Sequence, residues 1–326
     1  MKHILLIGAG FSRNWGGWLA DEAFEYLLGA PEIAANKSLA PLLWKHHGHG
    51  GFEDALAQLQ RAYMLNPQAN RNDLIDLQGA VTRMFDDMNA GFRNSRFEFN
   101  SHVNHSVKKF LARFDAIFTL NQDLLLEQHY CGEMNTWSQR KWLGCELPGM
   151  QPQTAGTVGN ANWSEIRWSP RPIDQYQTSS NCQPIYKLHG SSNWIATHGE
   201  PMIIVGGEKL RRIGTHPVLS KYFESFELLL GRPETKLMVI GYGFRDIHIN
   251  DVLIRELNRD LKLFVIGPDG AGAAQACSPS HGGAISATSK LEDAFKAGLI
   301  GASRRGLREI FGNDSVEFPK VERFFG

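Results

Sequence analysis

The sequence predicts an α/β fold built on a mostly parallel sheet, because short, unbroken apolar runs alternate with helical segments and end in glycine or polar residues. Such runs are typical of parallel strands that are buried on both faces. The runs cover residues 4–7, 116–120, 184–188, 237–240 and 263–266. We therefore expect a Rossmann-like sheet with helices on both faces. The turns after the strands meet at the carboxyl edge, where ligands of such sheets bind.

The chain between the first two strands carries helical signals over a length that exceeds a simple crossover. Residues 52–64 and 73–88 place their apolar side chains on one helical face. We therefore expect residues 30–112 to form a helical insertion that packs beside the sheet. Further helices are expected over residues 11–28 and 124–128.

Two further stretches lack a clear period. Residues 146–183 are rich in Pro, Gly, Asn, Gln, Ser and Trp, so we expect an irregular lid or partner loop there. Residues 267–289 are expected to form a loop of small residues. The expected organisation is one main domain over residues 1–290 and a C-terminal helical tail over residues 291–326.

The composition excludes several classes of protein. Of 326 residues 42% are hydrophobic, and Lys+Arg and Asp+Glu both number 34, so the formal net charge is zero. A balanced chain without a long basic run has no electrostatic footprint for nucleic acid or anionic lipid, so we expect neither as a direct partner. The apolar runs are too short for a signal peptide or a membrane span, and we expect a cytoplasmic protein.

The cysteine pattern argues against a metal site. The four cysteines include no CxxC pair, so a zinc ribbon is not expected, and free thiols fit a reducing compartment. They are Cys131, Cys145, Cys182 and Cys277. His46, His47 and His49 lie in a glycine-rich turn without supporting cysteines or carboxylates, and we interpret them as a solvated loop.

The first motif, residues 8–12, directly follows the first strand and opens a helix. Its residues are Gly8, Ala9, Gly10, Phe11 and Ser12. Glycines there let the backbone approach a pyrophosphate, which free N–H groups at a helix start favour. A tight strand–helix turn explains the same pattern. The motif departs from GxGxxG at Arg13, which disfavours an ordinary nicotinamide-dependent dehydrogenase.

The second motif runs from Thr119 to Asp123 at the end of the second strand. Asn121 can bind a ribose hydroxyl or a water there. Asp123 can anchor the loop or accept a hydrogen bond from a carboxamide. A helix N-cap explains an Asn or Asp at this junction equally well.

The third motif, His189-Gly190-Ser191, follows a buried strand. A histidine can accept a proton near neutral pH, and Gly190 allows close approach of a ligand. A structural histidine is the alternative, since the chain has 12 histidines.

The fourth motif is a second glycine-rich turn, Gly241-Tyr242-Gly243-Phe244, followed by Asp246 and His248. It could line an adenosine or a phosphate, or it could be a turn before a capped helix. Gly267, at the end of the last strand, could contact the adenine ribose.

In this order the motifs resemble the sirtuin (Sir2) superfamily. Residues 8–12 resemble its GAGxS loop, residues 119–123 its segment with Asn and Asp, His189-Gly190 its catalytic His-Gly, and residues 241–244 its later glycine turn. More narrowly, the chain resembles the zinc-free bacterial antiphage-defence NADases of the Thoeris and Sir2-HerA type. Deacylating sirtuins carry a four-cysteine zinc ribbon between the third and fourth motifs, whereas residues 195–222 contain no cysteine here.

The resemblance implies that residues 1–290 form an NAD-binding catalytic domain whose substrate is NAD+ and which needs no metal. The pyrophosphate would lie near Gly8, Ala9, Gly10 and Ser12. Asn121 would hold the nicotinamide ribose and a water, Asp123 would position the carboxamide side, and neutral His189 would act as general base. The other residues expected to line the nucleotide are Phe11, Thr119, Gly190, Ser191, Gly241, Tyr242, Gly243, Phe244 and Gly267.

The activity implied is an NAD+ glycohydrolase (NADase), the effector of an antiviral system that depletes NAD+ in abortive infection. The alternatives are an NAD-dependent protein deacylase and a catalytically silent NAD or ADP-ribose sensor subunit. Because an unrestrained NADase would kill its host, we expect a homo-oligomer and a separately encoded regulatory partner, such as a HerA-type ATPase or another defence protein.

Overall fold

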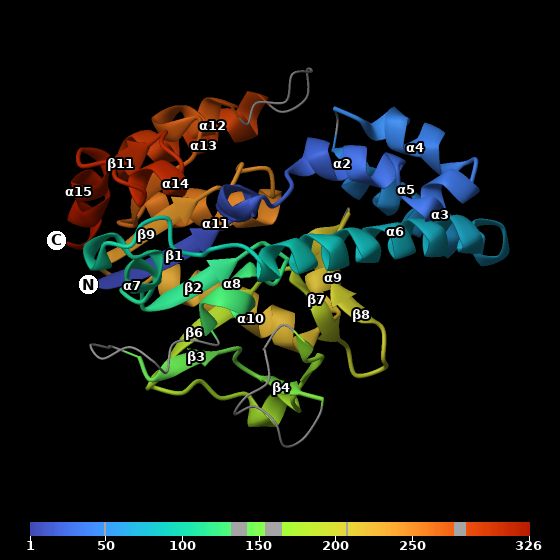
Figure 1. The fold of residues 1–326 in the computed structure, drawn as a ribbon, viewed down its shortest axis with the longest axis horizontal. Coiled ribbons are helices and arrows are strands. Elements are labelled where there is room, and N and C mark those ends of the chain that lie inside the picture. Colours follow the sequence, from blue (N-terminus) through green and yellow to red (C-terminus); the bar gives the residue numbers. More distant parts are fainter. Residues whose placement is uncertain (49, 132–141, 154–164, 207, 277–284) are drawn as a thin grey trace.

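A seven-stranded sheet forms the centre of the protein (Figure 1), in the order β11-β10-β9-β1-β2-β6-β3. This computed structural model describes residues 1–48, 50–131, 142–153, 165–206, 208–276 and 285–326. Every pairing in the sheet is parallel. The strands are β1 (Lys2–Ile7), β2 (Ala116–Thr119), β3 (Gly144–Glu146), β6 (Cys182–Lys187), β9 (Thr235–Ile240), β10 (Lys262–Ile266) and β11 (Leu299–Ser303). Helices flank the sheet, which confirms the predicted fold class.

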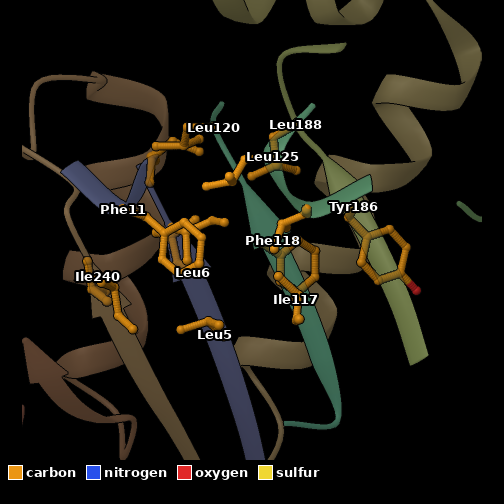
Figure 2. Packing of buried hydrophobic residues seen from close by; sticks show 14 of the residues in the cluster. Leu5, Leu6, Phe11, Ile117, Phe118, Leu120, Leu125, Tyr186, Leu188 and Ile240 are labelled. Atoms are coloured by element: carbon orange, nitrogen blue, oxygen red, sulfur yellow. The ribbon is translucent and has the colours of Figure 1, made fainter. Parts of the chain in front are cut away.

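The apolar side chains of the central strands explain why this sheet forms. Leu6 of β1 is opposite Phe118 of β2, which is opposite Tyr186 of β6. Figure 2 shows these side chains in one layer, and the rings of Phe118 and Tyr186 stack at 4.7 Å. Leu5 and Leu6, neighbours on opposite faces of β1, are both fully buried. Each such side chain contributes about 1.5–3 kcal/mol of transfer free energy, which a strand exposed on one face would lose at alternate positions.

Helices over residues 20–111 pack beside the sheet (Figure 1), as the helical periodicity predicts. They are α2 (Ala20–Leu28), α3 (Pro31–Ala35), α4 (Leu39–His46), α5 (Gly51–Leu65), α6 (Pro67–Arg93), η2 (Val103–His105) and α7 (Val107–Leu111). In α6, Leu74, Leu77, Val81 and Met84 recur every three or four residues and are all buried. The insertion therefore has its own apolar interior, which is continuous with the core of the sheet.

The helix expected over residues 11–28 is divided. It forms α1 (Ala9–Ser12), η1 (Arg13–Trp15) and α2, with Gly16 and Gly17 between them. Two consecutive glycines each cost about 1 kcal/mol in a helix, which is sufficient to end it. The short helix expected over residues 124–128 is α8 (Leu125–His129).

The described parts of residues 146–183 differ from the irregular loop that we expected. They contribute β4 (Met150–Pro152), β5 (Trp168–Pro170), η5 (Ile173–Gln175) and the start of β6; residues 154–164 lie outside the described residues. β4 and β5 join β7 (Gly190–Ile195) and β8 (Pro201–Ile203) in a small sheet of order β4-β5-β7-β8. Strands of three residues are too short to show a period of two, so the sequence pattern did not reveal them.

The segment after residue 291 also differs, because it is not only helical. β11 extends the central sheet next to β10, between α13 (Ile285–Gly298) and α14 (Leu307–Ile310), and α15 (Glu317–Glu322) and η7 (Arg323–Phe325) follow. The strand reads Leu-Ile-Gly-Ala-Ser, which lacks β-branched and aromatic residues apart from Ile300. A small residue is required at position 301, where a Cβ atom would lie 2.6 Å from the Phe264 ring.

Four further helices complete the fold, two of them before β9. They are α9 (Lys209–Gly214), α10 (Pro217–Leu230), α11 (Ile247–Leu257) and α12 (Ala273–Ala276), the last preceded by η6 (Gly270–Gly272). The loop expected over residues 267–289 therefore contains η6, α12 and the start of α13, and residues 277–284 lie outside the described residues. Over the described ranges, we find no helix whose length and apolar character would let it cross a membrane.

Candidate active site

A ladder of backbone hydrogen bonds joins the carboxyl ends of six neighbouring strands. At each step the first residue after one strand donates its N–H to the last residue of the next. The five bonds are Leu188 to Thr119 (2.9 Å), Leu120 to Ile7 (2.9 Å), Gly8 to Ile240 (3.0 Å), Gly241 to Ile266 (2.9 Å) and Gly267 to Ser303 (3.0 Å). The residue that follows each donor therefore lies at the carboxyl edge of the sheet. His189 follows Leu188 and Asn121 follows Leu120, so these two residues lie on adjacent turns.

Ser12, Asn121 and Asp123 form a buried hydrogen-bond network on this edge. The Asn121 amide donates to the Ser12 hydroxyl (3.0 Å), which donates to Asp123 Oδ2 (2.8 Å). Asp123 Oδ1 accepts the Leu125 N–H (3.1 Å) at the start of α8. Both Asp123 oxygens are thus used within the protein. Of the two roles considered for Asp123, these contacts correspond to anchoring the loop. Asp123 is not the N-cap of α8, because the N-cap residue is Leu124 and the helix start has no side-chain cap hydrogen bond.

The Asn121 side chain is held differently from a helix cap. Its backbone N–H donates to the Thr119 hydroxyl (3.0 Å), and its side-chain amide bonds Ser12 across the sheet. Across the part of the chain that the structure describes, its Oδ1 accepts no hydrogen bond. Because Asn121 is 8% exposed, this oxygen is a nearly buried acceptor that remains available to a ligand hydroxyl or a water.

A buried ion pair supports this network from the core side. Lys187 Nζ lies 2.7 Å from Glu127 Oε1 and donates to the Asp123 carbonyl at 2.6 Å. The side chains of Lys187 and Glu127 are only 2% exposed, and both line a small pocket with Ser12, Asn121 and Asp123. Loss of one partner would leave an uncompensated buried charge, at a cost of about 3–5 kcal/mol. A lysine inside an apolar strand was the one signal in the sequence for this pair, which we did not predict.

His189 is buried against a second histidine. It is 2% exposed, and its Nε2 lies 3.2 Å from His248 Nε2. Burial lowers the pKa of His189 to about 3, and the charge of Lys209 and the proximity of His248 act in the same direction. The charge of Asp246 and a backbone hydrogen bond with Leu120 oppose this shift. His189 is therefore neutral at physiological pH.

Lys209, on α9, forms ion pairs with α5 and with the residue that precedes α11, close to His189. Its Nζ lies 2.8 Å from Asp246 Oδ1, before α11, and 2.8 Å from Glu53 Oε2 on α5. Burial lowers the pKa of His248 as well, against the charge of Asp246. Asp246 and His248 were expected only to follow the fourth motif, without a role in the site. Both residues follow the end of β9 closely, and this position was the signal that could have placed them in the site. No sequence motif around Lys209 indicated a role for it.

The two glycine loops pack against each other, which is a structural reason for their glycines beside the predicted contact with a ligand. Gly241 has φ +65°, and a Cβ atom on it would lie 2.2 Å from the Phe11 backbone nitrogen. Gly8, Gly10 and Phe11 donate their N–H groups to Ile240, Gly241 and Gly8. These three N–H groups are thus engaged within the protein and are not free to bind a pyrophosphate.

Gly190 also has a structural reason. A Cβ atom on it would lie 2.0 Å from the Met202 carbonyl of β8, so the close approach it permits is that of a neighbouring strand. Ser191 is fully buried, and its hydroxyl donates to the Gln122 carbonyl at 3.5 Å. Both residues therefore fix the turn that carries His189, Gly190 by packing against β8 and Ser191 through its hydrogen bond with Gln122.

The remaining predicted residues divide between structural positions and open ones. The Tyr242 hydroxyl accepts the Asp246 N–H (3.0 Å), and Phe244 packs on Phe295 with rings 5.1 Å apart. Phe11 is buried against Trp15. Gly243 and Gly267, in contrast, would each meet nothing within 4 Å of an added Cβ atom, so space is open at these two turns.

Within the described residues, no three His, Cys, Asp or Glu side chains lie close enough together to hold a metal ion. Cys131 and Cys145 are buried and Cys182 is partly buried, whereas Cys277 and His49 lie outside the described residues.

The comparison with protein families identifies the class of domain. Residues 115–276 match the family model of the SIR2-like domain, a range that includes Asn121, His189 and the turn at Gly241. The match supports the Sir2-like superfamily. A search of curated proteins found no match. The SIR2-like domain implies use of NAD+ and indicates an NAD-dependent enzyme.

The buried histidines predict how stability depends on pH. The folded protein keeps His189 and His248 neutral, whereas in the unfolded chain they protonate near pH ~6.5. Below that pH the unfolded state binds more protons, so the free energy of unfolding should fall as the pH falls, by about 1.4 kcal/mol per pH unit for His189, whose pKa in the folded protein is about 3. In urea denaturation between roughly pH 6 and 4, His189→Gln should reduce this slope by about that amount. His198→Gln, at an exposed position, should leave it unchanged. Equal slopes in the wild type and His189→Gln would contradict the buried, neutral state.

Proposed function

We propose that the protein is an NAD+ glycohydrolase that hydrolyses the nicotinamide–ribose bond to give nicotinamide and ADP-ribose. The observation that carries the proposal is the backbone ladder, which sets Asn121 and His189 at the ends of the adjacent strands β2 and β6. An amide acceptor and a neutral imidazole are thereby brought together beside the loop of Ser12, although they are far apart in the sequence.

In the proposed reaction the C1′–N bond breaks, and nicotinamide leaves with the electron pair as a neutral molecule. Asn121 Oδ1 accepts a hydrogen bond from a ribose hydroxyl or from the attacking water. The oxygen of this water bonds to C1′, and its proton passes to His189, directly or through a ribose hydroxyl. The buried surroundings strengthen polar contacts with the oxocarbenium-like transition state. We assign Asp123 an anchoring role through Ser12 and Leu125, in place of contact with the carboxamide.

The elements above His189 favour hydrolysis over deacylation. β8 and α9 occupy the part of the chain where deacylating sirtuins carry a zinc ribbon. The Ile204 N–H donates to the His189 carbonyl at 2.8 Å, and Lys209 lies close enough to influence the pKa of this histidine. Water is a smaller nucleophile than an acyl-lysine peptide and fits this cover more readily. The sensor alternative is less favoured, because binding alone does not need a base beside Asn121.

We assign His248 a positioning role. His189 Nε2 and His248 Nε2 face each other at 3.2 Å, and we propose that His189 Nε2 is the acceptor of this pair, in line with the backbone interaction with Leu120 that raises the pKa of His189. His248 then donates from its own Nε2. This contact fixes the tautomer and orientation in which His189 can accept a proton.

We also propose that this closed state is a restrained one. His189 is nearly inaccessible, and with a pKa of about 3 it is a weak base. Lys209 holds α5 and the start of α11 together over it. Restraint fits the antiphage role suggested by the motifs, in which a homo-oligomer or a separately encoded partner, such as a HerA-type ATPase, would trigger depletion of NAD+.

The reaction is tested with purified protein and NAD+, following nicotinamide and ADP-ribose by chromatography with and without an acetyl-lysine peptide. We expect ADP-ribose without peptide, formed slowly by the restrained wild type and faster by Glu53→Gln. Turnover should be on the order of a hundredfold lower when Asn121→Ala or His189→Ala is added to Glu53→Gln. His198→Ala should match the wild type. Product that appears only with peptide would indicate a deacylase. Binding of NAD+ without any product, in both the wild type and the Glu53→Gln variant described below, would indicate a sensor.

The role of His248 is tested by the pH profile. His248→Phe keeps an aromatic ring against Phe223 but removes the donor, and we expect kcat about tenfold lower with an altered acidic limb and a nearly constant KM. His248→Gln retains a donor and should recover part of the rate. A uniform loss in both variants, with the profile unchanged, would show that His248 acts only through packing.

Restraint is tested by expressing the chain alone in bacterial cells and measuring NAD+. We expect the wild type to leave NAD+ nearly unchanged. Glu53→Gln, which weakens the ion pair with Lys209, should lower NAD+ by at least about twofold. Glu25→Gln is the matched control, because Glu25 is exposed on α2. Rapid loss of NAD+ with the wild-type chain would refute the restraint.

A further inference from the structure

We propose that a basic pocket between the carboxyl ends of β10 and β11 binds a phosphate on the adenosine ribose of the dinucleotide, so that the protein takes NADP+ as well as NAD+. The inference rests on the proposed function, because it uses the direction in which the nucleotide lies across the sheet.

The pocket has the size of a ligand site. Its volume is about 320 Å³, near the lower end of the range for small-molecule pockets, about 300–1,000 Å³. It is lined by η6, the end of β11, the turn after β11 and α15. The polar residues around it are Arg304, Arg305, Glu317 and Lys320.

The charges in the pocket leave one cation uncompensated. Lys320 pairs with Glu317 at 2.7 Å, and Arg305 pairs with Glu309 at 3.2 Å. Arg304, in contrast, makes no hydrogen bond or ion pair with any residue that the structure describes. A guanidinium group with free donors is suited to bidentate contact with a phosphate.

The turn of η6 determines where Arg304 lies. A Cβ atom at position 270 would be 2.8 Å from Arg304 Cγ, so the arginine stem packs directly over Gly270. Ala271 and Ala302 add little bulk beside it. The small residues at these positions therefore create the open volume and keep the guanidinium group next to it.

The register of the sheet connects this pocket to the active site. Gly8 bonds Ile240, Gly241 bonds Ile266 and Gly267 bonds Ser303, and Arg304 directly follows Ser303. Three strand spacings of about 4.8 Å place the turn of Arg304 about 14 Å along the edge from the turn of Gly8.

The direction of the nucleotide follows from the same edge. Asn121 and His189 lie on the opposite side of Gly8, over β2 and β6, so the nicotinamide half belongs there. The adenosine half must then extend over β9 and β10, past the open turn at Gly267. A phosphate on its ribose would come within reach of the long side chains of Arg304 and Arg305. Arginine is the residue that accommodates a 2′-phosphate in other doubly wound folds.

The test compares the affinities of NAD+ and NADP+ for the full chain by isothermal titration, in the His189→Ala background so that neither nucleotide is consumed. Arg304→Ser should weaken NADP+ binding about tenfold or more and change NAD+ binding less than about twofold. Arg304→Lys should recover part of the loss. Arg232→Ser, at an exposed position before β9, should change neither affinity.

Other outcomes would overturn the inference. An equal loss for both nucleotides, or no loss for either, would show that the pocket does not bind the ribose phosphate. Inorganic phosphate is titrated in parallel, and a response of phosphate alone to Arg304→Ser would indicate a free-phosphate site instead. If NADP+ binding depends on Arg304 but neither nucleotide is cleaved by the wild type or by Glu53→Gln, the hydrolase proposal fails and the pocket stands.

Discussion

The parallel register of β11, β10, β9, β1, β2 and β6 is the constraint on which the site depends. Shifting one strand by a single residue would turn its side chains to the other face, and Leu6 would no longer lie opposite Phe118. The apolar core thus fixes the register, and the register fixes which residues leave the sheet at its carboxyl edge. Asn121 and His189 are neighbours for this reason, and no direct contact between them is needed to hold them there.

The polar groups at this edge are buried, which is unfavourable unless they are hydrogen-bonded. The Ser12 hydroxyl accepts from the Asn121 amide and donates to Asp123. Lys187 donates to the Asp123 carbonyl while it pairs with Glu127. Charged groups inside the core therefore fix the conformation of the turn between β2 and α8. A rigid turn limits the positions that the Asn121 amide can adopt, which is the preorganisation that electrostatic catalysis requires.

Sequence reasoning found the central strands because their apolar runs are unbroken, and it found Asn121 and His189 because both follow such runs. It missed β11, whose small residues fit against Phe264 but carry little strand propensity. It assigned the glycines of the loops to ligand approach, whereas Gly241 is required by the packing of two turns. There is another reason why the sequence did not predict the roles of Lys187, Lys209 and Glu127. Their partners are distant in the sequence, and only the folded register brings them together.

In the proposed mechanism, the groups around His189 control both the access of substrate to the site and the pKa of this histidine. Burial is the main cause of its low pKa, and Asp246 is the nearby charge that opposes it. A movement that separates α5 from Lys209 would admit water and nucleotide and reduce the desolvation of the imidazole. The charge of Asp246 would then raise the pKa toward the range in which a histidine is an effective base. Opening would therefore admit the substrate and make His189 a stronger base in one step. In the closed state, turnover is prevented both because substrate is excluded and because His189 is a weak base.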